Sequence, residues 1–82
     1  MKVEVYTKSG CELCDEGIDL LRRKQRSHMF SLELHDIADR VDWFRAYRYR
    51  VPVVLIDGRE VLDLRFQEEA LTAALVAAEQ GA

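Results

Sequence analysis

The fold of this chain is decided by one stretch of sequence, VYTKSGCELC at residues 5–14. Val3, Val5 and Tyr6 are the β-branched and aromatic residues of a predicted short strand. Residues 7–10, TKSG, have the composition of a loop. A helix is predicted from about Cys11 to residue 25, because apolar residues recur there at spacings of three and four. Both cysteines of the chain therefore lie at or near the start of a helix that follows a strand.

Beyond this stretch, strand and helix patterns alternate to the end of the chain. Phe30, Leu32 and Leu34 alternate with polar residues, as in a half-buried strand. Asp39 is the predicted cap of a helix that cannot continue through Pro52. The remaining predicted elements are a helix at 39–48, a buried strand at 53–56, a hairpin turn at 57–58, a strand at 60–64 and a helix at 67–80. We therefore expect one α/β domain over residues 1–82, with the element order βαβαββα.

Composition and charge exclude several classes of protein. The chain has 82 residues, of which 49% are hydrophobic and 33% charged, with one proline, so disorder is not expected. Its net charge of −3 argues against a surface built for nucleic acid. No apolar run approaches the roughly 20 residues that span a bilayer, and the N-terminus has no apolar core of a secretory signal. We expect a cytoplasmic monomer without nucleic-acid or membrane partners.

The two cysteines are poorly spaced for a structural disulfide. A loop as short as the one from Cys11 to Cys14 would contribute only about 2 kcal/mol in the chain-entropy model. Small domains that depend on disulfides normally have several bridges over longer loops. This reasoning leaves two uses for the pair, redox chemistry or metal binding.

The predicted helix start assigns different roles to the two sulfurs. Cys11 would face unpaired backbone N–H groups and the positive end of the helix dipole, which favour the nucleophilic thiolate. Cys14 is in line with Ile18 and Leu21 and should be buried. We therefore assign Cys11 as the catalytic attacking sulfur and Cys14 as the catalytic resolving sulfur. Lys8 would favour the Cys11 thiolate and the acidic residues that follow would oppose it. The sequence does not predict which of these two effects on the thiolate is larger.

A zinc site is the alternative use of the pair. His28 and His35 follow Cys14 at distances outside the usual finger spacing, and their predicted elements come in the wrong order for a finger. We expect each histidine at a strand edge, either solvated or bonded to the backbone. No metal ligands are therefore assigned.

A second group of residues combines bases with aromatic rings. Arg45, Arg48 and Arg50 alternate with aromatic residues, a composition that can bind single-stranded nucleic acid. Trp43 and Tyr47, however, are helical i,i+4 neighbours. We interpret these two rings as core residues and do not assign a nucleic-acid site.

Several of these motifs resemble the glutaredoxins. VYTKSGCxxC at 5–14 resembles their active-site segment, and RVPV at 50–53 resembles their later Val-Pro segment. The whole pattern is similar to the glutaredoxin-like family of small bacterial and organellar proteins. The further matches are CELCDE at 11–16, DI at 36–37, the stretch 47–53, DGREVL at 57–62 and RF at 65–66.

The resemblance implies a thioredoxin-like fold, with a four-stranded mixed sheet of order 2-1-3-4 and three helices. The third strand would be antiparallel to the first. Pro52 would be cis and lie against the sulfur pair, a bond that costs about 0.5–1 kcal/mol over trans. The Val51 backbone would pair with an extended substrate or with the cysteinyl part of glutathione. Lys8 would bind a glutathione carboxylate.

The resemblance implies a thiol–disulfide oxidoreductase that acts on protein disulfides or on glutathione mixed disulfides. No tightly bound cofactor is expected, and glutathione is a possible co-substrate. The chain departs from typical glutaredoxins at Glu12-Leu13, where they have Pro-Tyr, and at 62–64, where they have a glycine pair. A protein dithiol therefore stays open as the reductant.

Two other functions remain open. The first is an iron–sulfur carrier, in which Cys11 of two chains holds a cluster together with glutathione. The second is a non-catalytic binding module. Replacing Cys11 by serine would abolish redox turnover but would leave a pure binding module unharmed, and a brown colour would indicate the cluster.

Overall fold

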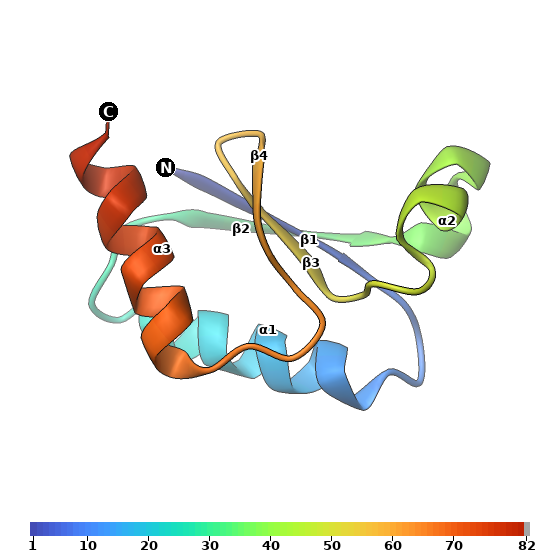
Figure 1. Ribbon diagram of the computed structural model, residues 1–82. Coiled ribbons are helices and arrows are strands. Elements are labelled where there is room, and N and C mark those ends of the chain that lie inside the picture. Colours follow the sequence, from blue (N-terminus) through green and yellow to red (C-terminus); the bar gives the residue numbers. More distant parts are fainter. Residues whose placement is uncertain (82) are drawn as a thin grey trace.

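Four strands form one mixed sheet, and α-helices pack on both of its faces (Figure 1). The computed structural model describes residues 1–81. The elements are β1 (Lys2–Thr7), α1 (Glu12–Lys24), β2 (Ser31–Asp36), a 3₁₀ turn (Ile37–Asp39), α2 (Val41–Tyr47), β3 (Val53–Ile56), β4 (Arg59–Asp63) and α3 (Glu68–Gln80).

The strand order is β2-β1-β3-β4, which confirms the predicted thioredoxin-like fold. β1 and β2 are parallel, as the intervening helix α1 requires, whereas β1–β3 and β3–β4 are antiparallel. Asp57 and Gly58 join β3 to β4 with φ values of 49° and 84°, the left-handed conformations of a two-residue hairpin. The predicted hairpin turn is therefore present.

The main core lies between the sheet and the helices α1 and α3, on the lower side of the sheet in Figure 1. Alternate residues of β1, Val3 and Val5, are fully buried there. Leu21 of α1 and both Leu71 and Leu75 of α3 cover them, also fully buried. Ala74 and Ala78 of α3 also pack against this core, whereas Ala70 is exposed.

A second cluster lies at the end of the sheet where β1 leads into α1. Its buried members are Cys14, Ile37 and Val51. Tyr6, Cys11, Trp43 and Tyr47 pack around them, and we call this set of seven residues the site cluster. It joins α1, α2 and the segment before β3, and so it fixes the positions of residues that are distant in sequence.

The start of α2 differs from the prediction. Asp39 does not cap this helix; it ends the 3₁₀ turn, and Arg40 is the N-cap, without a side-chain hydrogen bond. Asp36 is the residue that caps, because its carboxylate accepts the Ala38 N–H at 2.9 Å. An aspartate thus marks a helical start here, but of the 3₁₀ turn.

None of the helices within residues 1–81 has both the length and the apolar character needed to cross a bilayer.

Candidate functional site

Cys11 is the N-cap of α1. Its backbone is extended (φ −106°, ψ 107°), and its Sγ accepts the Cys14 N–H at 3.2 Å. The side chain is partly exposed. The sulfur therefore takes the place of the oxygen of an ordinary capping residue, at the end of the helix where backbone N–H groups lack partners.

Cys14 lies one turn further along α1 and is fully buried. Burial raises the pKa of the Cys14 thiol, and its hydrogen bond with Cys11 acts in the same direction. Weaker effects from the Thr7 hydroxyl and the Lys8 backbone lower this pKa. Both cysteines are free thiols, so the structure shows the reduced pair. One sulfur is thus accessible and the other is shielded and held protonated.

The Val51–Pro52 peptide bond is cis, as the resemblance implies. Val51 belongs to the site cluster together with both cysteines, and only 5% of it is exposed. Val51 lies outside the helices and strands, and none of the backbone hydrogen bonds made outside these elements in residues 1–81 involves it. Its amide and carbonyl are therefore without a backbone partner beside the sulfur pair.

Pro52 is brought against α1 by a glycine. A Cβ atom at Gly17 would lie 3.4 Å from Pro52 Cγ and 3.0 Å from Phe66 Cζ. Only the missing side chain allows both rings to approach the helix this closely. A glycine inside a helix costs up to about 1 kcal/mol relative to alanine, and the close approach of the two rings is the structural reason for a glycine at this position.

β4 holds the segment before Pro52 from the other side. The Leu64 N–H donates to the carbonyls of both Arg50 and Pro52 at 3.1 Å. Arg50 also pairs with Asp63 at 3.1 Å and with Glu60. Leu64 has a φ of 56°, uncommon for a residue with a side chain. The sequence analysis named Leu64 only as part of the departure from the family pattern at 62–64. It named Arg50 only as one of a group of bases and as the first residue of the RVPV motif.

Aromatic rings attach α2 to the site. The Tyr6 ring stacks on Tyr47 with centroids 4.5 Å apart and meets Trp43 edge-on at 5.3 Å. The prediction that Trp43 and Tyr47 are packing residues agrees with these contacts, although both rings are only partly buried. Their stacking fixes the segment that leads to Val51.

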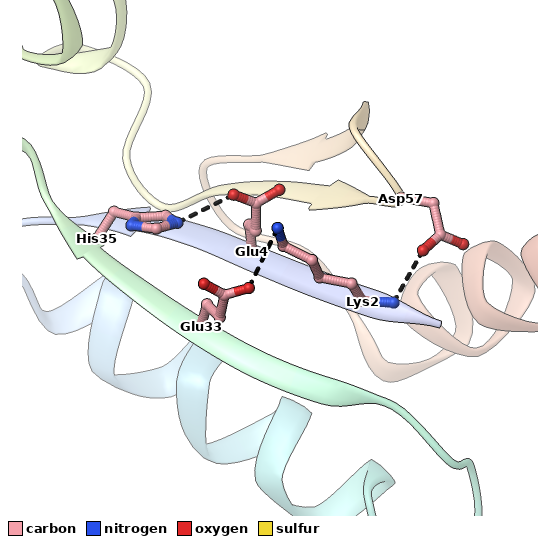
Figure 2. A network of polar contacts seen from close by, with 5 residues as sticks. All are labelled: Lys2, Glu4, Glu33, His35 and Asp57. Atoms are coloured by element: carbon pink, nitrogen blue, oxygen red, sulfur yellow. Dashed lines mark hydrogen bonds and ion pairs between the residues drawn. The ribbon is translucent and has the colours of Figure 1, made fainter.

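His35 lies on the edge strand β2, as predicted, but the predicted partners of both histidines were wrong. His35 bonds the Glu4 carboxylate at 3.0 Å and packs on the Tyr6 ring, and His28 bonds Glu79 at 3.0 Å. The partners are side chains of other elements, and only the tertiary fold brings them close. Figure 2 shows His35 and Glu4 on the sheet face turned away from α1, beside an ion pair of Lys2 with Glu33.

The structure brings four of the five predicted site residues together. Cys11, Cys14 and Val51 belong to one cluster. Pro52 follows Val51 in the chain and packs against α1 at Gly17. Lys8 is exposed in the loop before α1, and none of the ion pairs in the described residues includes it. Within residues 1–81, no group of three or more His, Cys, Asp or Glu side chains could hold a metal ion.

Residues 2–76 match the family model described as a glutaredoxin-like domain (DUF836). Among curated proteins, no match was found.

Solved structures are similar over nearly the whole chain. The X-ray structure of protein XcR50 from X. campestris is 34% identical, with 92% of this chain and 96% of that chain covered and a TM-score of 0.76. The solution structure of protein Ne2328 from Nitrosomonas europaea is 33% identical, with 90% and 89% covered and a TM-score of 0.75. A mutant thioredoxin from Halobacterium salinarum is 18% identical, with 94% and 73% covered and a TM-score of 0.67, which shows a common fold.

Proposed function

The chain belongs to the glutaredoxin-like family, and on this premise we propose that it is a thiol–disulfide oxidoreductase with Cys11 as nucleophile and Cys14 as resolving thiol. The family and the fold indicate a redox-type function. One observation carries the finer proposal: partly exposed Cys11 caps α1 and accepts the N–H of fully buried Cys14.

The reaction we propose has two exchange steps. The Cys11 thiolate attacks one sulfur of a substrate disulfide, forms a mixed disulfide and releases the other substrate sulfur as a thiolate. The Cys14 thiol then gives up its proton to a released thiolate and attacks Cys11 Sγ. A Cys11–Cys14 disulfide forms and the second substrate sulfur leaves as a thiolate, so the substrate gains two electrons from the chain, one proton from Cys14 and one proton from solvent.

We propose that the substrate binds as an extended chain beside Val51. The Val51 amide and carbonyl have no backbone partner, and an added strand would supply one. Pro52 limits the space on the side of α1, where it packs at Gly17. The substrate's disulfide would then lie over Cys11, the accessible member of the pair.

A thiol reductant must restore the dithiol after each cycle. We propose either glutathione, with Lys8 pairing to one of its carboxylates, or a protein dithiol. Lys8 is exposed at the loop that leads into Cys11, a position from which its ammonium group could reach such a carboxylate. A reducing compartment such as the cytoplasm suits this direction of electron flow.

Trapping of the mixed disulfide tests the proposal. A Cys14→Ser variant should stop after the first exchange and accumulate a covalent adduct with a disulfide-bearing peptide, because no second thiol releases it. Mass spectrometry under non-reducing conditions should locate the adduct on Cys11, and dithiothreitol should remove it.

The matched variant Cys11→Ser keeps the buried thiol and removes the accessible one. It should form no adduct in the same experiment and should show no turnover. Equal adduct formation by the two variants, or turnover that survives Cys11→Ser, would reject Cys11 as the nucleophile.

A further inference from the structure

The guanidinium group of Arg48 lies over two exposed aromatic rings in the segment that leads to Val51. Its guanidinium carbon is 5.4 Å from the ring centroid of Phe44 and 4.7 Å from that of Tyr49. Phe44 is 43% exposed and Tyr49 is 78% exposed. The rings are therefore not buried in the core, and the three side chains form a stack at the surface, which we call the Arg48 stack.

The arginines around the Arg48 stack differ in whether they have an ion-pair partner. Arg40 pairs with Asp42, and Arg50 pairs with two carboxylates of β4. Arg45 and Arg48 take part in none of the ion pairs found in residues 1–81. The whole chain has a net charge of −3, so these two unpaired arginines form a local positive surface on an acidic protein.

This surface adjoins the sulfur pair. α2 lies at the end of the sheet where β1 leads into α1, as Figure 1 shows. Tyr47 of α2 belongs to the site cluster with both cysteines, and Arg48 follows it directly. Only two residues separate Arg48 from Val51, so a chain that binds along Val51 passes close to the Arg48 stack.

The N–H donors of Arg48 have no carboxylate partner among the ion pairs of the described residues. These donors lie in the plane of the guanidinium group. These donors match a carboxylate in a bidentate arrangement, and the rings hold the fork in a preformed orientation.

We propose that Arg48 and Arg45 bind an acidic side chain of the protein substrate, next to the disulfide that Cys11 attacks. The inference rests on the proposed function and adds the substrate class: disulfides flanked by aspartate or glutamate. The carboxylate meets the edge of Arg48, and Arg45, in the last turn of α2, adds a second positive charge.

Nucleic acid would also be attracted by stacked arginines, but the surroundings favour a peptide. Two unpaired charges are few for a polyanion, whose affinity depends on many neutralised phosphates. A short acidic segment needs only the two arginines.

Two disulfide-bearing peptides test the proposal. They share one disulfide and differ only in having two glutamates or two lysines on one flank. The wild-type chain should reduce the glutamate peptide with kcat/KM about tenfold higher than the lysine peptide, the effect of about 1.4 kcal/mol in binding, and the preference should weaken as salt is added.

Arg45→Glu/Arg48→Glu should abolish or reverse this preference. The matched control, Arg22→Glu/Arg26→Glu, makes the same change of net charge at the far end of α1 and should retain it. Arg48→Lys should lower the preference although the charge is kept, because the planar fork is lost. Circular dichroism verifies the fold of each variant, and Arg48→Gln replaces the double variant if that one unfolds.

Equal rates of the wild type with both peptides would overturn the inference. So would an equal loss of preference in the two double variants, or an RNA oligonucleotide that binds the wild type while the peptides react at equal rates. Wild-type turnover of a small neutral disulfide, bis(2-hydroxyethyl) disulfide, separates the two proposals. Its absence rejects the proposed function, whereas its presence with equal peptide rates rejects only the acidic-substrate inference.

Discussion

At the scale of single residues, the site consists of two identical side chains in different surroundings. Cys11 is partly exposed at the start of α1, where its sulfur accepts an N–H, whereas Cys14 is fully buried one turn later. Burial raises the pKa of Cys14 and so keeps it a thiol. In the proposed reaction, the first exchange step therefore has one available sulfur, and burial would protect the second sulfur from reagents in solution until a mixed disulfide has formed.

The raised pKa of Cys14 should make the stability of the reduced chain depend on pH. Above about pH 8.5 an unfolded cysteine loses its proton while buried Cys14 retains it. The unfolded state then binds fewer protons, so the free energy of unfolding decreases as pH rises, and the stabilisation present at lower pH is lost toward the folded pKa. We expect this decrease in Cys11→Ser, where Cys14 is the only thiol, in urea unfolding between about pH 7 and 9.5.

Cys11→Ser/Cys14→Ala is the matched control and should lose less stability over the same range. Tyr6, whose pKa burial also raises, titrates above this range in both variants. Parallel pH profiles of the two variants would contradict a raised pKa of Cys14.

The roles of some site residues can be predicted from the sequence, and those of others cannot. The spacing of the two cysteines and the predicted helix start indicated their positions, whereas the cis Pro52 beside them was implied by the family resemblance. The role of Leu64 could not be predicted. Its positive φ follows from the path of the chain past Pro52, and a leucine gives no indication of such a conformation. The partners of His35 and His28 come from elements far away in sequence, and no local pattern encodes them.

At the scale of elements, α1 and the segment before β3 form the site through one close contact. Gly17 lets Pro52 and Phe66 lie against the helix, one turn beyond Cys14. Leu64, directly after β4, and Asp63 of β4, which pairs with Arg50, fix the same segment from the other side. The position of Val51 relative to the cysteines thus depends on packing from two sides.

Gly17→Leu should disturb this contact. A leucine would gain about 0.8 kcal/mol in helix propensity, but its side chain would overlap both rings, and such overpacking costs roughly 1–3 kcal/mol. We expect a net loss of stability in urea unfolding and a slower reduction of peptide disulfides, because Pro52 is displaced.

Ala73→Leu is the matched control, because Ala73 is an exposed residue of α3. It should change the free energy of unfolding by no more than about 0.5 kcal/mol. A Gly17→Leu variant as stable and as active as this control would show that the close contact is not needed.

The order of the elements could be predicted from the sequence, but the residues at which the elements begin and end were harder to predict. Alternating patterns and the Asp57-Gly58 turn indicated four strands and three helices in the observed order. The predicted start of α2 was wrong because Asp36 and Asp39 are both acceptable caps, and only the path of the chain after β2 decides between them. The sheet order itself came from the family resemblance, since local patterns do not determine strand neighbours.

At the scale of the whole molecule, stability and chemistry reside on different parts of the sheet. The main core under α1 and α3 is made of aliphatic side chains, whereas the site cluster under α2 contains both cysteines and three aromatic rings. The sheet face turned away from α1 also has the polar contacts of Lys2, Glu4 and His35 shown in Figure 2. A domain of this size can thus vary its site without rebuilding its core.

The unpaired positive charges near the site are also confined to one part of the molecule. The chain is acidic overall, yet its unpaired arginines near the site belong to α2 and the turn after it. This arrangement would draw an acidic partner toward the end of the molecule that holds Cys11.

A single-turnover reaction tests the central claim most directly. Reduced wild-type chain is mixed with one equivalent of a small disulfide, and the mass of the intact chain and the released thiols are measured. We predict a chain lighter by two hydrogen atoms, with Cys11 and Cys14 linked, and two equivalents of substrate thiol. A chain of unchanged mass, or a stable adduct that Cys14 never resolves, would contradict the account.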